Sequence, residues 1–143
     1  MEKIKVLFVC IHNSARSQMA EALLNSMAGD KFEATSAGLE KGNLNPLAVK
    51  VMAEIGIDIS NNQTKSVFDF YHDARLFNYV VTVCDAANSE RCPVFPGAKK
   101  SLHWSFEDPS SFTGTEEEKL EKTRKIRDEI RDELEKFIKT ISS

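Results

Sequence analysis

The stretch Val6-Leu7-Phe8-Val9-Cys10-Ile11-His12-Asn13-Ser14-Ala15-Arg16-Ser17 decides the fold, because an apolar run passes through a short polar segment directly into a helical pattern. Residues Ile4 to Val9 are almost continuously apolar, which predicts a strand that is buried on both faces. After Arg16 the apolar residues recur at helical spacing, which predicts a helix that ends near Gly29. The stretch therefore predicts a strand, a tight loop and a helix in immediate succession.

The rest of the chain continues this alternation of strands and helices. Apolar patterns and turn residues predict strands at 32–37, 79–83 and 101–104, and helices at 46–55, at 67–76 and from Thr115 onward. Such alternation favours a parallel sheet joined by right-handed crossovers. We therefore predict an α/β fold in three layers, a four-stranded parallel sheet with helices on both faces, formed by a single domain at 1–143.

The composition excludes several classes of function. The chain has 143 residues, of which 41% are hydrophobic, so it can bury a core without metals or disulfides. Its formal net charge of −3 argues against a nucleic-acid or membrane partner. No apolar segment is long enough for a membrane span or a signal peptide, so we expect a cytoplasmic protein. A monomer is taken as the default oligomeric state. Cysteines in such a compartment are more often catalytic, redox-active or buried than bridged.

The polar loop has the features of an oxyanion site that carries a nucleophile. Cys10 and Arg16 are separated by five residues and lie where a loop enters a helix. Backbone N–H groups, the helix dipole and the guanidinium all favour an anion there, so we expect Cys10 to react as a thiolate and Arg16 to bind two oxygens. Ser17 is placed to hydrogen-bond the sulfur, and Asn13 is expected to form the bend because the loop lacks glycine. The predicted substrate-binding residues are Ile11, His12, Asn13, Ser14, Ala15, Arg16 and Ser17.

Two further reactive side chains follow other strands of the predicted sheet. Cys10 follows the first strand, Cys84 the third, and Asp108 comes shortly after the last. The carboxyl ends of parallel strands meet at one edge of a sheet, so we expect these side chains at a common rim, with Asp108 protonating a leaving oxygen. The alternatives are that Cys84 is a buried apolar residue and that Asp108, which precedes Pro109, serves only a turn.

The third cysteine, Cys92, lies in the segment Asp85 to Gly97, whose turn residues predict an irregular and mobile loop. It is either a functional thiol or an idle one. No close pair of cysteines or histidines has the spacing of a zinc site, so no metal site is predicted.

Several further stretches of the chain form a recognisable set: Asn13-Ser14-Ala15-Arg16-Ser17-Gln18-Met19-Ala20-Glu21, Ser36-Ala37-Gly38, Gly56-Ile57-Asp58-Ile59-Ser60, Val80-Val81-Thr82-Val83-Cys84, Cys92-Pro93, His103-Trp104 and Glu107-Asp108-Pro109. Together they resemble the thioredoxin-coupled arsenate reductases, which are built on the low-molecular-weight tyrosine phosphatase fold.

The resemblance implies a reaction that uses all three cysteines. Cys10 attacks arsenate, Arg16 binds it, and Asp108 assists the loss of an oxygen. Cys84 then attacks Cys10 and releases arsenite, and Cys92 attacks Cys84 to form a disulfide that thioredoxin reduces. The implied partners are arsenate and thioredoxin.

The chain also departs from the family pattern. Ile11-His12 stands where members often have Thr-Gly. Some members bind potassium through residues that match Asn13, Glu21 and Ser36 and through a carboxylate in the segment after Ile59. This chain has Lys65-Ser66 at about that place. Lys65 argues against the potassium site, which stays an open alternative, and we expect no tightly bound cofactor.

Two other functions stay open at this point. A protein tyrosine phosphatase needs only Cys10, Arg16 and Asp108, although phosphatases of this fold tend to carry tyrosines where this chain has Ser110-Ser111-Phe112. A non-enzymatic module that binds oxyanions or senses redox state would instead contain a Cys10 thiol of ordinary reactivity.

Overall fold

A computed structural model describes residues 3–11, 13, 15–38, 42–66, 77–83 and 100–142 of the chain. The elements are β1 (Ile4–Cys10), α1 (Arg16–Ala28), β2 (Phe32–Gly38), α2 (Pro46–Ala53), β3 (Tyr79–Thr82), β4 (Lys100–His103), the 3₁₀ turn η2 (Pro109–Ser111) and α4 (Glu116–Ser142). The helix predicted at 67–76 and the loop predicted at 85–97 lie outside the described residues.

The strands form one four-stranded sheet in the order β2-β1-β3-β4, and every neighbouring pair is parallel. The register places Cys10 opposite Gly38 and Val9 opposite Thr82, while Thr82 in turn faces His103. The predicted four-stranded parallel sheet is therefore confirmed. All four carboxyl ends lie at one edge, which is the edge where β1 delivers Cys10.

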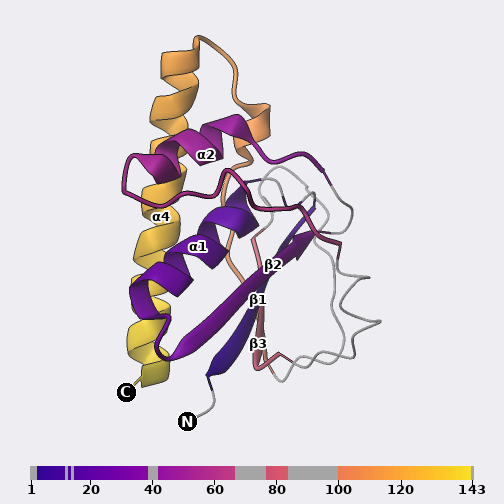
Figure 1. The fold of residues 1–143 in the computed structure, drawn as a ribbon, viewed down its shortest axis with the longest axis vertical. Helices are drawn as coiled ribbons and strands as arrows, with labels where there is room; N and C mark the ends of the chain where they lie inside the picture. The colour runs from indigo at the N-terminus through magenta and orange to yellow at the C-terminus, as the bar shows by residue number, and fades with distance from the viewer. Residues whose placement is uncertain are drawn as a thin grey trace.

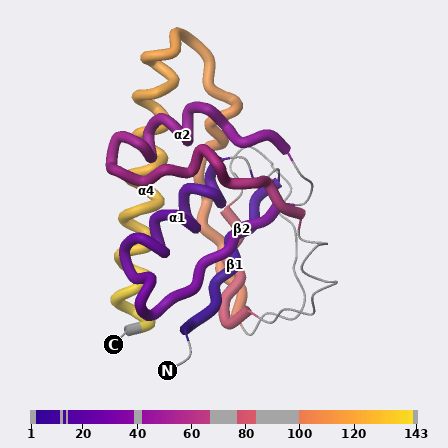
Figure 2. The backbone as a smooth tube through the Cα atoms, viewed as in Figure 1, coloured from indigo at the N-terminus to yellow at the C-terminus, as the bar shows by residue number. Residues whose placement is uncertain are grey.

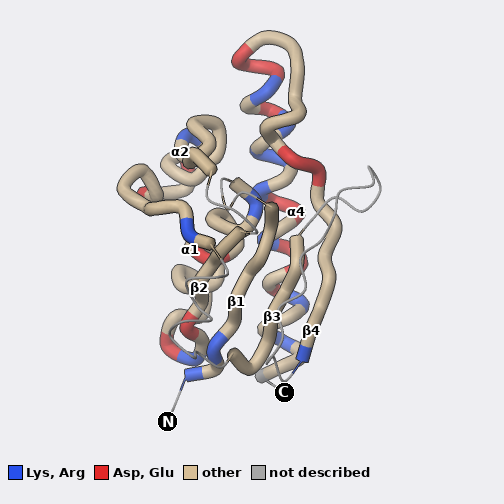
Figure 3. Tube along the Cα trace, turned by 90° about the vertical axis from the view of Figure 1, so that its right-hand side faces the viewer, with Lys and Arg blue, Asp and Glu red and all other residues tan. Residues whose placement is uncertain are grey.

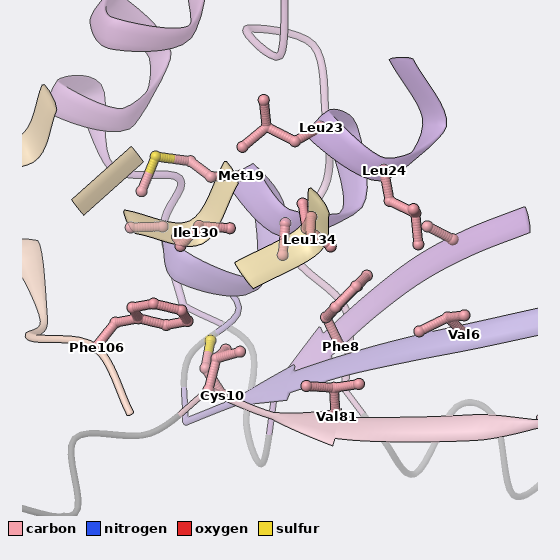
Figure 4. Packing of buried hydrophobic residues seen from close by; sticks show 14 of the residues in the cluster. Val6, Phe8, Cys10, Met19, Leu23, Leu24, Val81, Phe106, Ile130 and Leu134 are labelled. Carbon is pink, nitrogen blue, oxygen red and sulfur yellow. The ribbon is translucent and has the colours of Figure 1, made fainter. Parts of the chain in front are cut away.

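The helices α1 and α4 pack against each other on the same side of the sheet, and α2 packs on α4 (Figure 1). The tube in Figure 2 shows α4 running the length of the molecule behind α1. The main core lies between these helices and the sheet, and Figure 4 shows Val6 and Leu24 toward one end of it and Cys10 and Phe106 toward the other. One end of the core is thus also the rim of the sheet.

The other face of the sheet carries a smaller apolar cluster. Because side chains alternate along a strand, Val6, Phe8 and Cys10 belong to the main core while Leu7 and Val9 point to the opposite side. There they join Ala37, Phe77 and Val80.

The helix ends follow the residues that cap them. Asn45 caps α2, because its side-chain oxygen accepts a hydrogen bond from the N–H of Leu47 at 2.8 Å. Regular helix extends to Ala53, and the turn that closes it is formed by Gly56, which adopts a φ of 81°, with the N–H of Ile57 bonded back to the carbonyl of Met52 at 3.0 Å. This pattern is a Schellman motif, so the chain leaves the helix at the glycine that directly follows the predicted range.

The long helix α4 begins where the sequence predicts, directly after Thr115. The hydroxyl oxygen of Thr115 accepts a hydrogen bond from the N–H of Glu118 at 3.2 Å. Red and blue bands alternate along α4, whereas the strands are mostly uncharged (Figure 3). Two arginines of α4 bind the residue that follows α2. Arg124 and Arg127 lie 2.8 and 3.1 Å from the carboxylate of Glu54. Among the helices in the described ranges, none combines the length and apolarity that crossing a membrane requires.

Candidate active site

Cys10 is the last residue of β1 and is buried, with 2% of its surface exposed. The strand therefore reaches one residue further than the sequence predicts. Its sulfur lies 2.9 Å from the hydroxyl oxygen of Ser17 and 3.2 Å from the backbone nitrogen of Asn13, which donates to it. The predicted contact between Ser17 and the sulfur is thus present. Two polar groups meet a sulfur that would otherwise sit in an apolar core.

Asn13 forms the bend in the loop. Its φ of 55° is the one positive value at a non-glycine position in the described ranges. Asparagine is among the few residues that adopt this left-handed conformation readily. The bend turns the N–H of Asn13 back toward the sulfur of Cys10, so the backbone conformation itself creates a hydrogen-bond donor for the nucleophile.

The side chain of Asn13 fixes the direction of the hydrogen bonds that reach Cys10. Its oxygen accepts from the backbone N–H of Lys65 at 2.8 Å, and a backbone N–H can only donate, so this contact sets the orientation of the amide. The amide nitrogen then donates to the hydroxyl oxygen of Ser17 at 2.8 Å. The hydroxyl hydrogen of Ser17 is left to point at the sulfur of Cys10. This chain of donors stabilises negative charge on the sulfur.

Gln18 is fully buried and supports the loop through its side-chain hydrogen bonds. Its side-chain nitrogen lies 3.0 Å from the Asn13 side-chain oxygen and 3.0 Å from the carbonyl of Gln63, and its oxygen accepts from Asn62 at 3.1 Å. Sequence reasoning missed these supporting residues. No sequence signal pointed to Gln18, because a polar residue beside the inward-facing Met19 on a helix can equally face solvent.

Arg16 begins α1 and is buried, with 3% of its surface exposed. One guanidinium nitrogen donates to the carbonyl of Phe106 at 3.1 Å, and another lies 3.6 Å from a carboxylate oxygen of Asp108. The residue before it, Ala15, provides no side-chain cap for the helix. The helix therefore presents backbone N–H groups and a fixed positive charge beside Cys10, which is an arrangement suited to an oxyanion.

Asp108 has both of the contacts that the sequence left as alternatives. One of its carboxylate oxygens caps the 3₁₀ turn by accepting from the N–H of Ser110 at 3.0 Å, and the other faces Arg16. Its side chain is 21% exposed. The turn thus holds the carboxyl group at the mouth of the loop. Of the three side chains predicted at the rim, Cys10 and Asp108 both lie beside Arg16, and Cys84 is outside the described residues.

The structure describes only one of the other predicted site residues. Ile11 is half-buried at the start of the loop, whereas His12, Ser14, Cys84 and Cys92 lie outside the described residues. In the described part of the chain, no three His, Cys, Asp or Glu side chains are grouped closely enough to hold a metal ion.

Comparison with known proteins identifies the family. Residues 5–143 match the family described as low molecular weight phosphotyrosine protein phosphatase. The chain belongs to this family. The arsenate reductase of Bacillus subtilis strain 168 is 45% identical to it over 142 residues, which are 98% of this chain and 99% of that protein. The predicted resemblance is thereby confirmed.

Solved structures of family members share the fold described above. The arsenate reductase of Archaeoglobus fulgidus DSM 4304 superimposes with a TM-score of 0.76 at 34% identity, covering 93% of this chain and 98% of that one. The thioredoxin-dependent arsenate reductase of Corynebacterium glutamicum gives a TM-score of 0.71 at 32% identity, covering 98% of this chain and 62% of that one.

Proposed function

We propose that this chain reduces arsenate to arsenite, with Cys10 as the nucleophile and thioredoxin as the final reductant. Three features of the site support the first step: a sulfur that accepts two hydrogen bonds, the buried guanidinium of Arg16, and the carboxyl group of Asp108 beside it. The relatives named arsenate reductase match this chain over nearly its full length, which supports arsenate as the oxyanion.

In the first step the thiolate of Cys10 attacks the arsenic atom while Arg16 binds two of the oxygens. A third oxygen, which carries the proton of hydrogen arsenate, takes a second proton from Asp108 and leaves as water. A covalent bond now joins the sulfur to arsenic, which is still in its +5 state. The residues of the loop hold the oxyanion, and the oxidation state of arsenic does not change in this step.

The second step needs a thiol next to Cys10, and one observation supports Cys84 in this role. The N–H of Val83 donates to the carbonyl of Val9 at 2.9 Å, and Cys84 and Cys10 each follow one residue of this pair in the chain. The thiolate of Cys84 attacks the sulfur of Cys10, an S–S bond forms, and the electron pair of the S–As bond passes to arsenic. Arsenite with arsenic in the +3 state is released.

The third step regenerates Cys10. The thiolate of Cys92 attacks Cys84, so the disulfide moves to the pair Cys84 and Cys92 and Cys10 leaves as a thiolate. The dithiol of thioredoxin then reduces this disulfide and supplies the two electrons that arsenate has taken. Seven residues separate the two cysteines, and a connecting segment of that length allows them to meet.

Cysteine variants test this three-step transfer of the disulfide, called the relay below, because each variant stops the reaction at a different step. Arsenite would be measured with thioredoxin, thioredoxin reductase and NADPH, and disulfides would be mapped by mass spectrometry after one turnover. We expect Cys92→Ser to release one equivalent of arsenite and stop with Cys10 bonded to Cys84, and Cys84→Ser to release none. Wild-type protein should contain a disulfide between Cys84 and Cys92. Sustained turnover by Cys92→Ser would refute the relay.

A phosphatase is the second candidate, since the family match carries that description and Cys10, Arg16 and Asp108 would suffice for it. In that reaction water, and no second thiol, would release the product from Cys10. Hydrolysis of a phosphotyrosine peptide with no arsenate turnover would favour this function. Weak phosphatase activity beside strong arsenate turnover would support the reductase.

A further inference from the structure

The ammonium group of Lys65 lies among oxygen atoms directly behind the nucleophile loop. We propose that it serves the loop as a covalently attached cation, in the place where some members of the family bind potassium, and that Lys65 is a positioning residue for Cys10. The activity part of this proposal rests on the proposed function, whereas its stability part does not.

The contacts of Lys65 define a small charged cluster. Its ammonium nitrogen is 3.5 Å from a carboxylate oxygen of Glu21 and 3.5 Å from the carbonyl of Gln63. The same Glu21 oxygen accepts a hydrogen bond from Ser36 at 3.0 Å. The Glu21 side chain is only 15% exposed, so its charge needs a compensating cation nearby, and Lys65 supplies it.

The residues present do not fit a bound potassium ion. The side-chain oxygen of Asn13 already accepts from the Lys65 backbone and from Gln18, and the Glu21 oxygen already faces Ser36 and an ammonium group. Position 65 itself contributes a positive charge where a cation site needs a further oxygen. A metal cation would meet occupied lone pairs and electrostatic repulsion.

Lys65 is also tied through its backbone to the elements that shape the site. Its N–H holds the side chain of Asn13 at 2.8 Å, and its carbonyl accepts from the N–H of Gly38 at 2.8 Å. The side chain adds a link to Glu21 on α1. Lys65 therefore connects the loop, β2 and α1, and the orientation of the Asn13 amide, which directs the donors toward Cys10, depends on its position.

The first test needs no variant. Wild-type protein would be compared in potassium, sodium and choline chloride at one ionic strength, about 0.1 M, which keeps screening constant. We expect the melting temperature to agree within about 1 °C and kcat/KM for arsenate within about twofold, because no cation binds the folded state. A saturable rise in either quantity with potassium and not with choline would overturn the proposal. The melting temperature decides this even if arsenate is not the substrate.

Variants at position 65 separate the charge from the backbone. Lys65→Met keeps the backbone contacts and removes the ammonium, so kcat/KM should fall about tenfold to a hundredfold, and Lys65→Arg should restore most of it. Lys65→Asp adds a carboxylate beside Glu21, so an alkali-metal chloride should raise its melting temperature above the value in choline chloride. Lys50→Met, which removes an exposed lysine paired with Glu116, is the matched control and should leave activity unchanged. Equal activity of Lys65→Met and wild type, or a Lys65→Asp protein indifferent to the salt, would overturn the proposal.

Discussion

Replacing Asn13 by alanine tests the hydrogen-bond chain at its centre. The substitution removes the acceptor for the N–H of Lys65 and the donor for the hydroxyl of Ser17, and it leaves a Cβ-bearing residue at a φ of 55°. Gln18 keeps the carbonyl of Gln63 as an acceptor, so its amide is not left without a partner. The loss is therefore concentrated on the N–H of Lys65 and on the backbone of residue 13.

The magnitude follows from these two losses. A buried N–H without a partner costs about 1–3 kcal/mol. A left-handed conformation at an ordinary residue costs about 1–2 kcal/mol. Asn13→Ala should therefore lower the free energy of unfolding by about 2–5 kcal/mol. Asn13→Gly loses the same hydrogen bonds but relieves the backbone, so it should be more stable than Asn13→Ala by up to about 1 kcal/mol after its own entropy cost.

Urea unfolding followed by fluorescence measures this directly. Trp104 is the one tryptophan in the sequence, and it packs against Phe8 and Phe137 at ring-centre distances of 6.0 and 5.7 Å, so it reports on the core. Alkylation of Cys10 in a Cys84→Ser, Cys92→Ser background provides the reactivity readout, and both Asn13 variants should react more slowly near neutral pH. A loss below about 0.5 kcal/mol in Asn13→Ala would refute the reasoning, as would a glycine variant that is less stable than the alanine variant.

Three further predictions concern the site and the surface. Arg16→Lys keeps a positive charge but loses the planar fork that reaches Phe106 and Asp108, so kcat/KM for arsenate in the coupled assay should fall by about 10²-fold or more. Asp108→Asn keeps the acceptor for the 3₁₀ turn and loses the proton, so single-turnover arsenite release should slow by about 10²-fold while the melting temperature changes little; an unchanged rate would exclude Asp108 as the acid. The Arg124 hydrogen bond holds the pKa of Glu54 below its usual 4.5, so this carboxylate stabilises the fold above about pH 4.5 and loses that effect as the pH falls through the lowered pKa. Stability measured from about pH 6 to 3 should therefore fall less steeply in Glu54→Gln than in the wild type, and identical slopes would contradict the assignment.

Much of the fold could be predicted because its determinants are local. The apolar run that ends at Cys10, the Asn45-Pro46 start of α2 and the Thr115 cap each specify an element within a few residues. The position of Asp108 could also be predicted, since parallel strands bring their carboxyl ends to one edge. The end of α2 could be predicted as well, because Gly56, which directly follows the predicted range, adopts the left-handed conformation that closes the helix.

The contacts that hold the loop after Cys10 in place could not be predicted, because they join parts of the chain that are distant in sequence. Asn13 and Lys65 are 52 positions apart, and their hydrogen bond joins a side chain to a backbone N–H. A backbone group is present at every residue, so no sequence pattern distinguishes the one at Lys65. The charge of Lys65 was visible in the sequence, but its pairing with Glu21 depends on how the polar segment at 57–66 crosses α1.

Residues that contact each other in the site lie far apart in the sequence, and this distance affects when the site is completed during folding. Cys10 is made early in synthesis, yet its loop depends on Lys65, and Arg16 depends on the carbonyl of Phe106, 90 positions later. Contacts over such distances form late, because a long chain must close before they form. A nascent chain therefore carries its nucleophile long before it carries the groups that activate it. The described contacts of the loop and of Arg16 can all be present only once the chain has been made at least as far as Phe106.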